Sequence, residues 1–227
     1  MIRLKEYTLT ILGILRKDLL LEWRSREQVG GMLVFALLAI LIFNFALELE
    51  ASPTPGTVSG VLWVTLIFAG TIGLNRAMAS EKANSCFDSL LLAPVDRSAV
   101  YFGKAFGNTL FMWVVAAILL PLLAVLYPVN VMHGGIVLII VLGTLGYSLS
   151  GTLLSAMTYQ TRARDMLLPI LLFPVALPVL LAAVKATGML LGDFPLADAH
   201  FWVNMLLAFD VIFAVLGWML FDFVVEE

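Results

Sequence analysis

The chain has 227 residues, of which 62% are hydrophobic and 13% charged, with a formal net charge of −3. Soluble domains carry about 25% charged residues, and a mean hydropathy of +1.03 implies more apolar surface than a soluble fold can bury. The composition therefore excludes a soluble protein and indicates an integral membrane protein.

The first 28 residues are expected to form a cytoplasmic helix that lies in the membrane interface. Apolar residues recur on one side of this helix, at Leu4, Ile11, Leu12, Leu15 and Leu19. Basic residues such as Arg3 and Lys5 can reach lipid headgroups. A half-span that dips into the bilayer is the alternative. The segment also mimics a signal peptide, but Arg16, Lys17 and Asp18 stand where a cleavage site needs small residues, so we expect no cleavage.

Six later stretches are long and apolar enough to cross a bilayer, which takes about 20 residues. In chain order they are about 29–47, 57–75, 105–127, 134–157, 166–184 and 201–221. The predicted fold class is all-α, with six transmembrane helices in a single transmembrane domain over residues 1–227.

The positions of lysine and arginine predict the orientation of these spans, because cytoplasmic loops carry an excess of both. Residues 1–28 hold six, the loop after the second span holds Arg76, Lys82, Arg97 and Lys104, and the loop after the fourth holds two. The opposite loops, 48–56, 128–133 and 185–200, hold only Lys185. Both termini are therefore expected in the cytoplasm.

The loop between the second and third spans is expected to hold a short amphipathic helix over residues 80–94. Ser80 can cap a helix that begins at Glu81, and Pro94 ends it, while Asp96 can cap the helix that follows. Its apolar face combines Phe87, Leu90 and Leu91, and its polar positions are Glu81, Ser85 and Asp88. Such a helix suits docking into a groove of a soluble partner. A helix that only lies on its own membrane surface is the alternative.

Several features inside the predicted spans stand out. Small residues in the fourth span, at Gly143, Gly146, Ser150, Gly151 and Ser155, predict a close-packing face. Gly103 and Gly107 form a GxxxG motif at the start of the third. The fifth span contains Pro169, Pro174 and Pro178, which predict a kinked or locally broken helix, either a hinge or a static bend.

Asp210 lies near the middle of the sixth span. A charge there costs about 2.5–3.5 kcal/mol on insertion scales, so we expect the side chain to face protein or water. It is expected to be protonated, or paired with a donor such as Asn44 or Asn108. Two roles stay open: a transport path or proton relay, or a hydrogen bond between helices.

Motifs for nucleotide hydrolysis, metal binding and nucleophilic catalysis are absent from the sequence. The only Gly-Lys pair, Gly103-Lys104, has Ser98 where a phosphate loop needs its first glycine. No HExxH or GxSxG occurs, and nothing points to nucleic acid. Cys86 is alone and is interpreted as a small buried residue. His133 and His200 fall in outer loops, where a haem or metal ligand is possible but a solvated histidine is commoner.

The number and order of these elements resemble the membrane subunits of type-2 ABC exporters. More narrowly, the chain resembles the CcmB family of the haem-handling ABC complex of cytochrome c maturation. The resemblance rests on "SLLLAPVDRSAVYFGKAFGNTLF", "LLPILLFPVALPVLLAAV" and "AFDVIFAVLGWMLFDFVVEE" and covers nearly the whole chain. The family often has a glycine and a glutamate in the segment between spans two and three, where this chain has Asn84 and Asp88.

The resemblance implies a permease subunit of the bacterial inner membrane that does no catalysis itself. A separate CcmA-like ATPase would bind the ATP, and CcmC-like and CcmD-like subunits, a second copy of this chain and a CcmE-like haem chaperone would be partners. Residues 81–94 would then be the coupling helix. Haem would be the cargo, or ATP hydrolysis would release the haem-loaded chaperone. No cofactor is expected to bind this chain directly.

Other functions remain to be weighed. An ABC permease for a lipid or drug would have the same architecture. An intramembrane enzyme would need a second buried acid or histidine beside Asp210, and a scaffold would need no ATPase.

Overall fold

The computed structural model describes residues 2–47, 53–83, 96–127, 129, 134–159, 161 and 164–226. Within these ranges the chain is all-α, with seven helices and no strand. The helices are α1 (Ile2–Ser25), α2 (Glu27–Leu47), α3 (Pro55–Ala83), α5 (Arg97–Leu126), α6 (Gly134–Thr158), α7 (Arg164–Leu191) and α8 (His200–Glu226). The helices α2, α3, α5, α6, α7 and α8 are each long and apolar enough to cross a membrane. The predicted all-α fold class with six spans is confirmed.

Three of these helices extend well beyond the predicted spans. Helix α3 continues to Ala83 and α5 already begins at Arg97, so the basic residues at 76, 82, 97 and 104 lie on helices and not in a long loop. Helix α7 continues to Leu191, which places Lys185 inside it. Sequence reasoning ended each span where the apolar run ended, but a helix continues through polar residues that lie beyond the bilayer.

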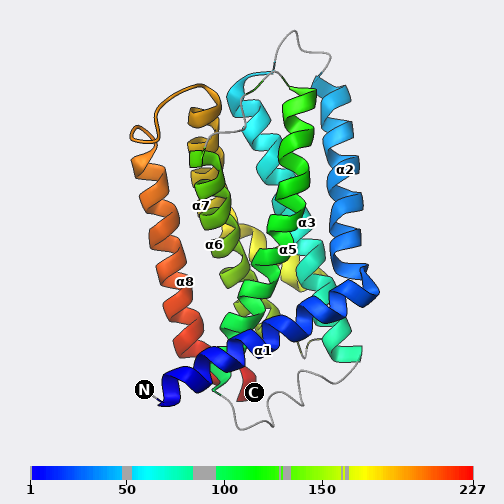
Figure 1. Ribbon diagram of the computed structural model, residues 1–227, viewed down its shortest axis with the longest axis vertical. Coiled ribbons are helices and arrows are strands. Elements are labelled where there is room, and N and C mark those ends of the chain that lie inside the picture. Colours follow the sequence, from blue (N-terminus) through cyan, green and yellow to red (C-terminus); the bar gives the residue numbers. More distant parts are fainter. Residues whose placement is uncertain are drawn as a thin grey trace.

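Helix α1 lies across one end of the bundle formed by the other six helices (Figure 1). Both ends of the chain lie at this same end (Figure 1). The chain changes direction between α1 and α2 at Arg26, whose backbone has a left-handed φ of 52°. The Glu22 carboxylate accepts hydrogen bonds from the backbone N–H groups of Gln28 (3.2 Å) and Val29 (2.8 Å). These bonds satisfy free donors at the start of α2 and so stabilise the corner between the two helices.

Helix α6 is the most buried of the six spans, while α2 and α8 lie at the two edges of the bundle (Figure 1). In the most apolar stretch of α6 78% of the residues are buried, against 17% in α2 and in α8. Small side chains allow this central position. A methyl group at Gly143 would collide with the Trp63 indole, and one at Gly151 would collide with Leu74, both on α3. The predicted close-packing face of α6 is confirmed.

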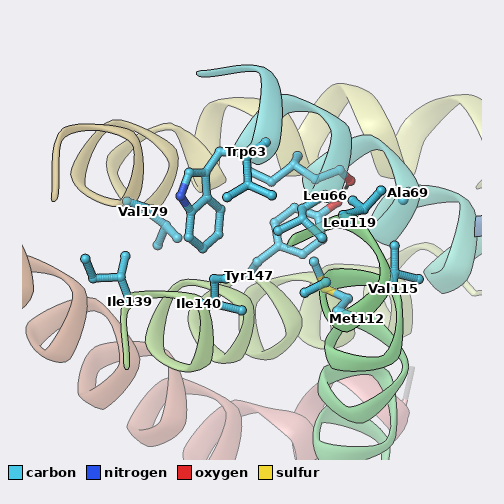
Figure 2. Packing of buried hydrophobic residues seen from close by; sticks show 14 of the residues in the cluster. Trp63, Leu66, Ala69, Met112, Val115, Leu119, Ile139, Ile140, Tyr147 and Val179 are labelled. Atoms are coloured by element: carbon cyan, nitrogen blue, oxygen red, sulfur yellow. Dashed lines mark hydrogen bonds between the residues drawn. The ribbon is translucent and has the colours of Figure 1, made fainter. Parts of the chain in front are cut away.

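The core around α6 combines large aromatic rings with polar anchors. Figure 2 shows the Trp63 and Tyr147 rings together with apolar side chains from α5, α6 and α7. The Trp63 indole N–H donates to the Thr187 hydroxyl (2.9 Å), and the Tyr147 hydroxyl donates to the carbonyl of Ile67 (3.0 Å). The buried polar tips of both rings therefore have partners, as a low-dielectric interior requires.

Helix α7 runs without interruption through Pro169, Pro174 and Pro178. The predicted local break is therefore wrong, and a kink or hinge at these prolines stays a prediction. The neighbouring helices explain the continuity, because α7 packs against α3, α6 and α8. Such packing supports a proline-containing helix when some of its backbone hydrogen bonds are missing.

Candidate functional site

The predicted coupling helix lies largely outside the described residues. Of the side chains expected to contact an ATPase, those of Glu81, Ser85, Phe87, Asp88, Leu90, Leu91 and Pro94 all lie outside the described part of the chain. The backbone of residues 80–83 belongs to α3, so Ser80 is not the N-cap of a new helix, and Glu81 belongs to the last turn of α3. Asp96 occupies the N-cap position of α5, but its side chain makes no capping hydrogen bond.

The end of α3 and the start of α5 lie at the end of the bundle that α1 crosses (Figure 1). Its two ends connect directly to α3 at Ala83 and to α5 at Arg97. Through the covalent chain, the segment is therefore connected to the last turn of α3 and to the first turns of α5.

The first turns of α5 form polar contacts with α1, α6 and α8. The hydroxyls of Ser98 and Tyr7 on α1 are 3.1 Å apart and share a hydrogen bond. The Tyr101 hydroxyl lies 3.1 Å from the carbonyl of Leu149 on α6 and 3.0 Å from that of Phe213 on α8. The Arg97 guanidinium donates to the carbonyl of Asp222 at the end of α8. A displacement of this part of α5 would act on all three helices.

Lys104 and Asp18 form the central contact between α5 and α1. The Lys104 ammonium lies 2.8 Å from one carboxylate oxygen of Asp18 and 3.0 Å from the other, so the contact is both an ion pair and a hydrogen bond. Only 7% of the Lys104 side chain and 15% of the Asp18 side chain are exposed. Asp18 also lies 3.3 Å from the Lys17 ammonium, so its carboxylate contacts two cations. Removal of Asp18 would take this carboxylate away from the buried Lys104 ammonium, which is costly.

The GxxxG motif of α5 lies beneath α1. A methyl group at Gly103 would come within 3.0 Å of Ile14, and one at Gly107 would be in ordinary contact with Leu15 and Asp18. The two glycines thus bring α1 close enough for the ion pair to form. The motif mediates the contact with the helix across the end of the bundle, not a contact between two spans.

Tyr7 is a titratable residue of α1 whose pKa is changed by its environment at this contact. Burial raises the pKa of the Tyr7 hydroxyl above its ordinary value, and the negative charge of Asp96 acts in the same direction. The hydrogen bond with Ser98 lowers the pKa and so partly opposes burial. The neutral form of Tyr7 is therefore favoured in the folded chain.

Asp210 faces protein in the middle of α8, as expected from its cost in lipid. Its side chain is 6% exposed, and neither carboxylate oxygen has a hydrogen-bond partner among the described residues. The predicted donors are wrong. Asn108 accepts from the Gln28 amide and donates to the Thr152 hydroxyl, and Asn44 lies on α2 at the opposite edge of the bundle (Figure 1).

Metal-binding clusters are absent from the described part of the chain. His200 begins α8, and its Nδ1 lies 2.7 Å from the Ala197 carbonyl, which accepts a hydrogen bond from that nitrogen in the tautomer that carries the proton there. His133 lies outside the described residues. Among the described residues His200 belongs to no group of three or more histidines, cysteines and acids that could hold a metal ion.

Sequence reasoning missed the Lys104–Asp18 pair, because Lys104 was placed in a loop and Asp18 was considered only as an obstacle to signal-peptide cleavage. A signal was present. Lys104 directly follows Gly103 in the GxxxG motif, and a lysine beside a close helix contact needs a counter-charge on the opposing helix.

The similarity of this chain to known proteins extends over nearly its whole length. The family model described as "CcmB protein" matches residues 9–225. A protein named "Heme exporter protein B" from Rhodobacter capsulatus is 27% identical over 74% of this chain and 78% of its own length. Its namesake from Pseudomonas aeruginosa is 24% identical over 86% of this chain and 88% of its own length, and that from Paracoccus denitrificans is 25% identical over 77% and 80%. With six helices fit to span a membrane and a family match along almost its full length, this chain is a multi-pass membrane protein that belongs to the CcmB family.

Proposed function

We propose that this chain is the membrane permease subunit of an ABC transporter complex that handles haem during cytochrome c maturation. Support comes from the family match over residues 9–225 and from relatives that are named heme exporter protein B. The proposed coupling between ATP hydrolysis and the bundle rests on the contacts made by the first three turns of α5. These turns follow residues 84–95 directly and make polar contacts with α1, α6 and α8.

In this proposal a separate ATPase subunit docks on residues 81–94, with Phe87, Leu90 and Leu91 as its apolar contact. ATP-driven closure of the ATPase moves the segment and therefore the start of α5. Because α5 is bonded to α1 through Lys104 and to α6 and α8 through Tyr101, the movement changes the balance between two arrangements of the bundle. The ATPase binds and hydrolyses ATP, and this chain transmits the change.

The coupling step is tested by co-purification with the ATPase in detergent. Leu90→Glu with Leu91→Glu is expected to insert normally but to lose both binding and stimulation of ATP turnover. The matched control is Phe194→Glu with Leu196→Glu, which adds the same two carboxylates at exposed apolar residues of the connection between α7 and α8. Equal binding by the Leu90/Leu91 variant would show that the segment does not dock the ATPase.

We further propose that the end of the bundle with α1 and both termini faces the cytoplasm of a bacterial inner membrane. The support is that twelve of the thirteen lysines and arginines belong to α1 or to the segments predicted on that side. The test labels Ser25→Cys and Phe194→Cys separately with a membrane-impermeant maleimide, each in a Cys86→Ser background. In spheroplasts Phe194→Cys should react and Ser25→Cys should not, and the reverse pattern would invert the topology.

The haem role is tested in cells that depend on this chain. Its deletion should abolish all c-type cytochromes while leaving b-type cytochromes intact. Haem that accumulates on the chaperone in the deletion strain would favour chaperone release over passage of haem through this subunit. Normal c-type cytochromes in the deletion strain, with altered lipid or drug export, would replace haem by another cargo.

A further inference from the structure

Asp210 lies where three helices meet. A methyl group built on Gly146 of α6 would collide with an Asp210 carboxylate oxygen and would also contact Phe209 of α8 and Val179 of α7. The absence of a side chain at Gly146 therefore leaves the room that the carboxyl group occupies. The carboxyl group lies against the backbone of α6, and no other side chain of α6 separates them.

No described side chain offers this carboxyl group a positive charge. Helix α6 has no Asp, Glu, His, Lys or Arg between Gly134 and Thr158, and its Tyr147 hydroxyl is bonded to α3. On α7, Lys185 lies six residues beyond Val179, about 9 Å along the helix, and Arg164 and Asp165 lie about 20 Å away in the other direction.

The remaining charged or titratable groups near Asp210 are committed elsewhere. Tyr101 of α5 contacts α8, but its hydroxyl is within hydrogen-bond distance of the carbonyls of Leu149 and Phe213. The Lys104 ammonium is bonded to Asp18. On α8 itself, His200 and Asp222 are ten and twelve residues away from Asp210, near the two ends of the helix. An ionised Asp210 would be a buried charge with neither a donor nor a counter-charge.

We infer that Asp210 is a proton-binding site at the junction of α6, α7 and α8, which carries its proton while the junction is closed and releases it when the junction opens to water. The closed packing tolerates only the neutral acid, because neither oxygen has a donor among the described residues. An arrangement that separates α8 from Gly146 would hydrate the carboxyl group and let it ionise. Opening is then linked to the release of one proton.

The direction of the pH dependence follows from this linkage. The closed arrangement binds one proton more than the open one, so a fall in pH favours the closed arrangement and a rise in pH favours the open one. Between the two pKa values of Asp210 in the two arrangements, the open-to-closed ratio rises up to about tenfold per pH unit. This inference concerns the chain itself and holds or fails independently of the proposed ATPase and cargo.

Infrared spectroscopy of the purified chain tests the bound proton. In a detergent without ester groups at pH 7, the chain should show the carbonyl band of a protonated carboxylic acid, and Asp210→Asn should remove it. The matched control Asp222→Asn, near the end of the same helix, should leave the band in place. A wild-type spectrum without the band, or a band that persists in Asp210→Asn, would overturn the assignment.

Thiol labelling tests the link between the proton and opening. Val179→Cys, in a Cys86→Ser background, places a thiol at a position that is 1% exposed and becomes reachable only when the junction opens. Its maleimide labelling rate is measured against pH with Asp210 intact and with Asp210→Asn, and the ratio of the two rates cancels the titration of the thiol. The ratio should rise with pH by up to about tenfold per unit. A flat ratio, or no labelling in either background, would show that no proton-linked opening occurs.

Discussion

Lys104 and Asp210 are both buried ionisable side chains on spanning helices, but within the described part of the chain only Lys104 has a hydrogen-bonding partner. The Lys104 ammonium lies 2.8 Å and 3.0 Å from the two oxygens of the Asp18 carboxylate. Neither oxygen of Asp210 has a hydrogen-bond partner among the described residues. A buried charge is tolerated when an opposite charge compensates it, and otherwise the group adopts its neutral form.

The two regions differ in function for the same reason. The ion pair attaches α1 to the first turns of α5, next to the segment where we propose that the ATPase docks, so in that proposal α1 and the start of α5 move together. The contact of Asp210 with α6 needs no attachment and can separate when water reaches it. In these two proposals, the contact between Lys104 and Asp18 at the end of the bundle is permanent, and the contact between Asp210 and Gly146 in its middle is reversible.

Loss of the counter-charge should have the largest effect on stability. Asp18→Ala removes the carboxylate that contacts the buried Lys104 ammonium and should lower the free energy of unfolding by about 3–5 kcal/mol. The measurement is unfolding of the purified chain in mixed micelles. Asp18→Leu combined with Lys104→Met should recover most of the loss, because no buried charge remains. A double variant as unstable as Asp18→Ala would mean that the pair does not act through charge.

An added methyl group between Gly146 and Asp210 should have the second largest effect on stability. Gly146→Ala inserts a methyl group against the Asp210 carboxyl group and Phe209 and should cost about 1–3 kcal/mol. The same substitution in an Asp210→Ala background should cost clearly less, since the carboxyl group is gone. Gly60→Ala is the control, because a methyl group there meets nothing within 4 Å. Equal costs in both backgrounds would place Asp210 away from Gly146.

Replacement by asparagine should change the free energy of unfolding differently at the two buried acids, Asp210 and Asp18. Asp210→Asn resembles the protonated acid in size and charge and should change the free energy of unfolding by less than about 1.5 kcal/mol, the range of volume-conserving replacements. Asp18→Asn removes a charge that Lys104 needs and should cost considerably more. The same unfolding measurement compares the two variants at pH 7. If both variants lose the same stability, Asp210 is ionised in the folded chain and the comparison fails.

The spans and their order were predictable because hydrophobic length is a property of sequence alone. The close-packing face of α6 was predictable too, since glycine and serine at Gly143, Gly146 and Ser150 have few other uses in an apolar helix. Partners across helices were not predictable. Asn108 was expected near Asp210, but it bonds to Gln28 and Thr152, because which faces meet depends on how the helices are arranged around α6.

The position of α1 shows the same limit. Its amphipathic pattern predicted a helix outside the spans but not the surface that it contacts. That surface is the GxxxG face of α5, which a sequence pattern alone assigns equally well to contact between two spans. The ends of α3 and α7 were missed because polar residues can extend a helix beyond the apolar run that predicts its span.

The hydrogen bond between Tyr7 and Ser98 is expected to contribute least to the attachment of α1 to α5. Tyr7→Phe removes the hydrogen bond with Ser98 and should cost about 0.5 kcal/mol, the low end for a partly exposed pair. Burial raises the pKa of Tyr7 above its ordinary 10.0, so the contribution of Tyr7 is complete below pH 10 and is lost as the pH rises through the raised value. The wild type should therefore lose stability in alkali more steeply than Tyr7→Phe, in parallel unfolding curves at pH 7 and at alkaline pH. Parallel loss in both proteins would show that Tyr7 is not held neutral against α5, and the attachment of α1 would then depend on Lys104 and the two glycines alone.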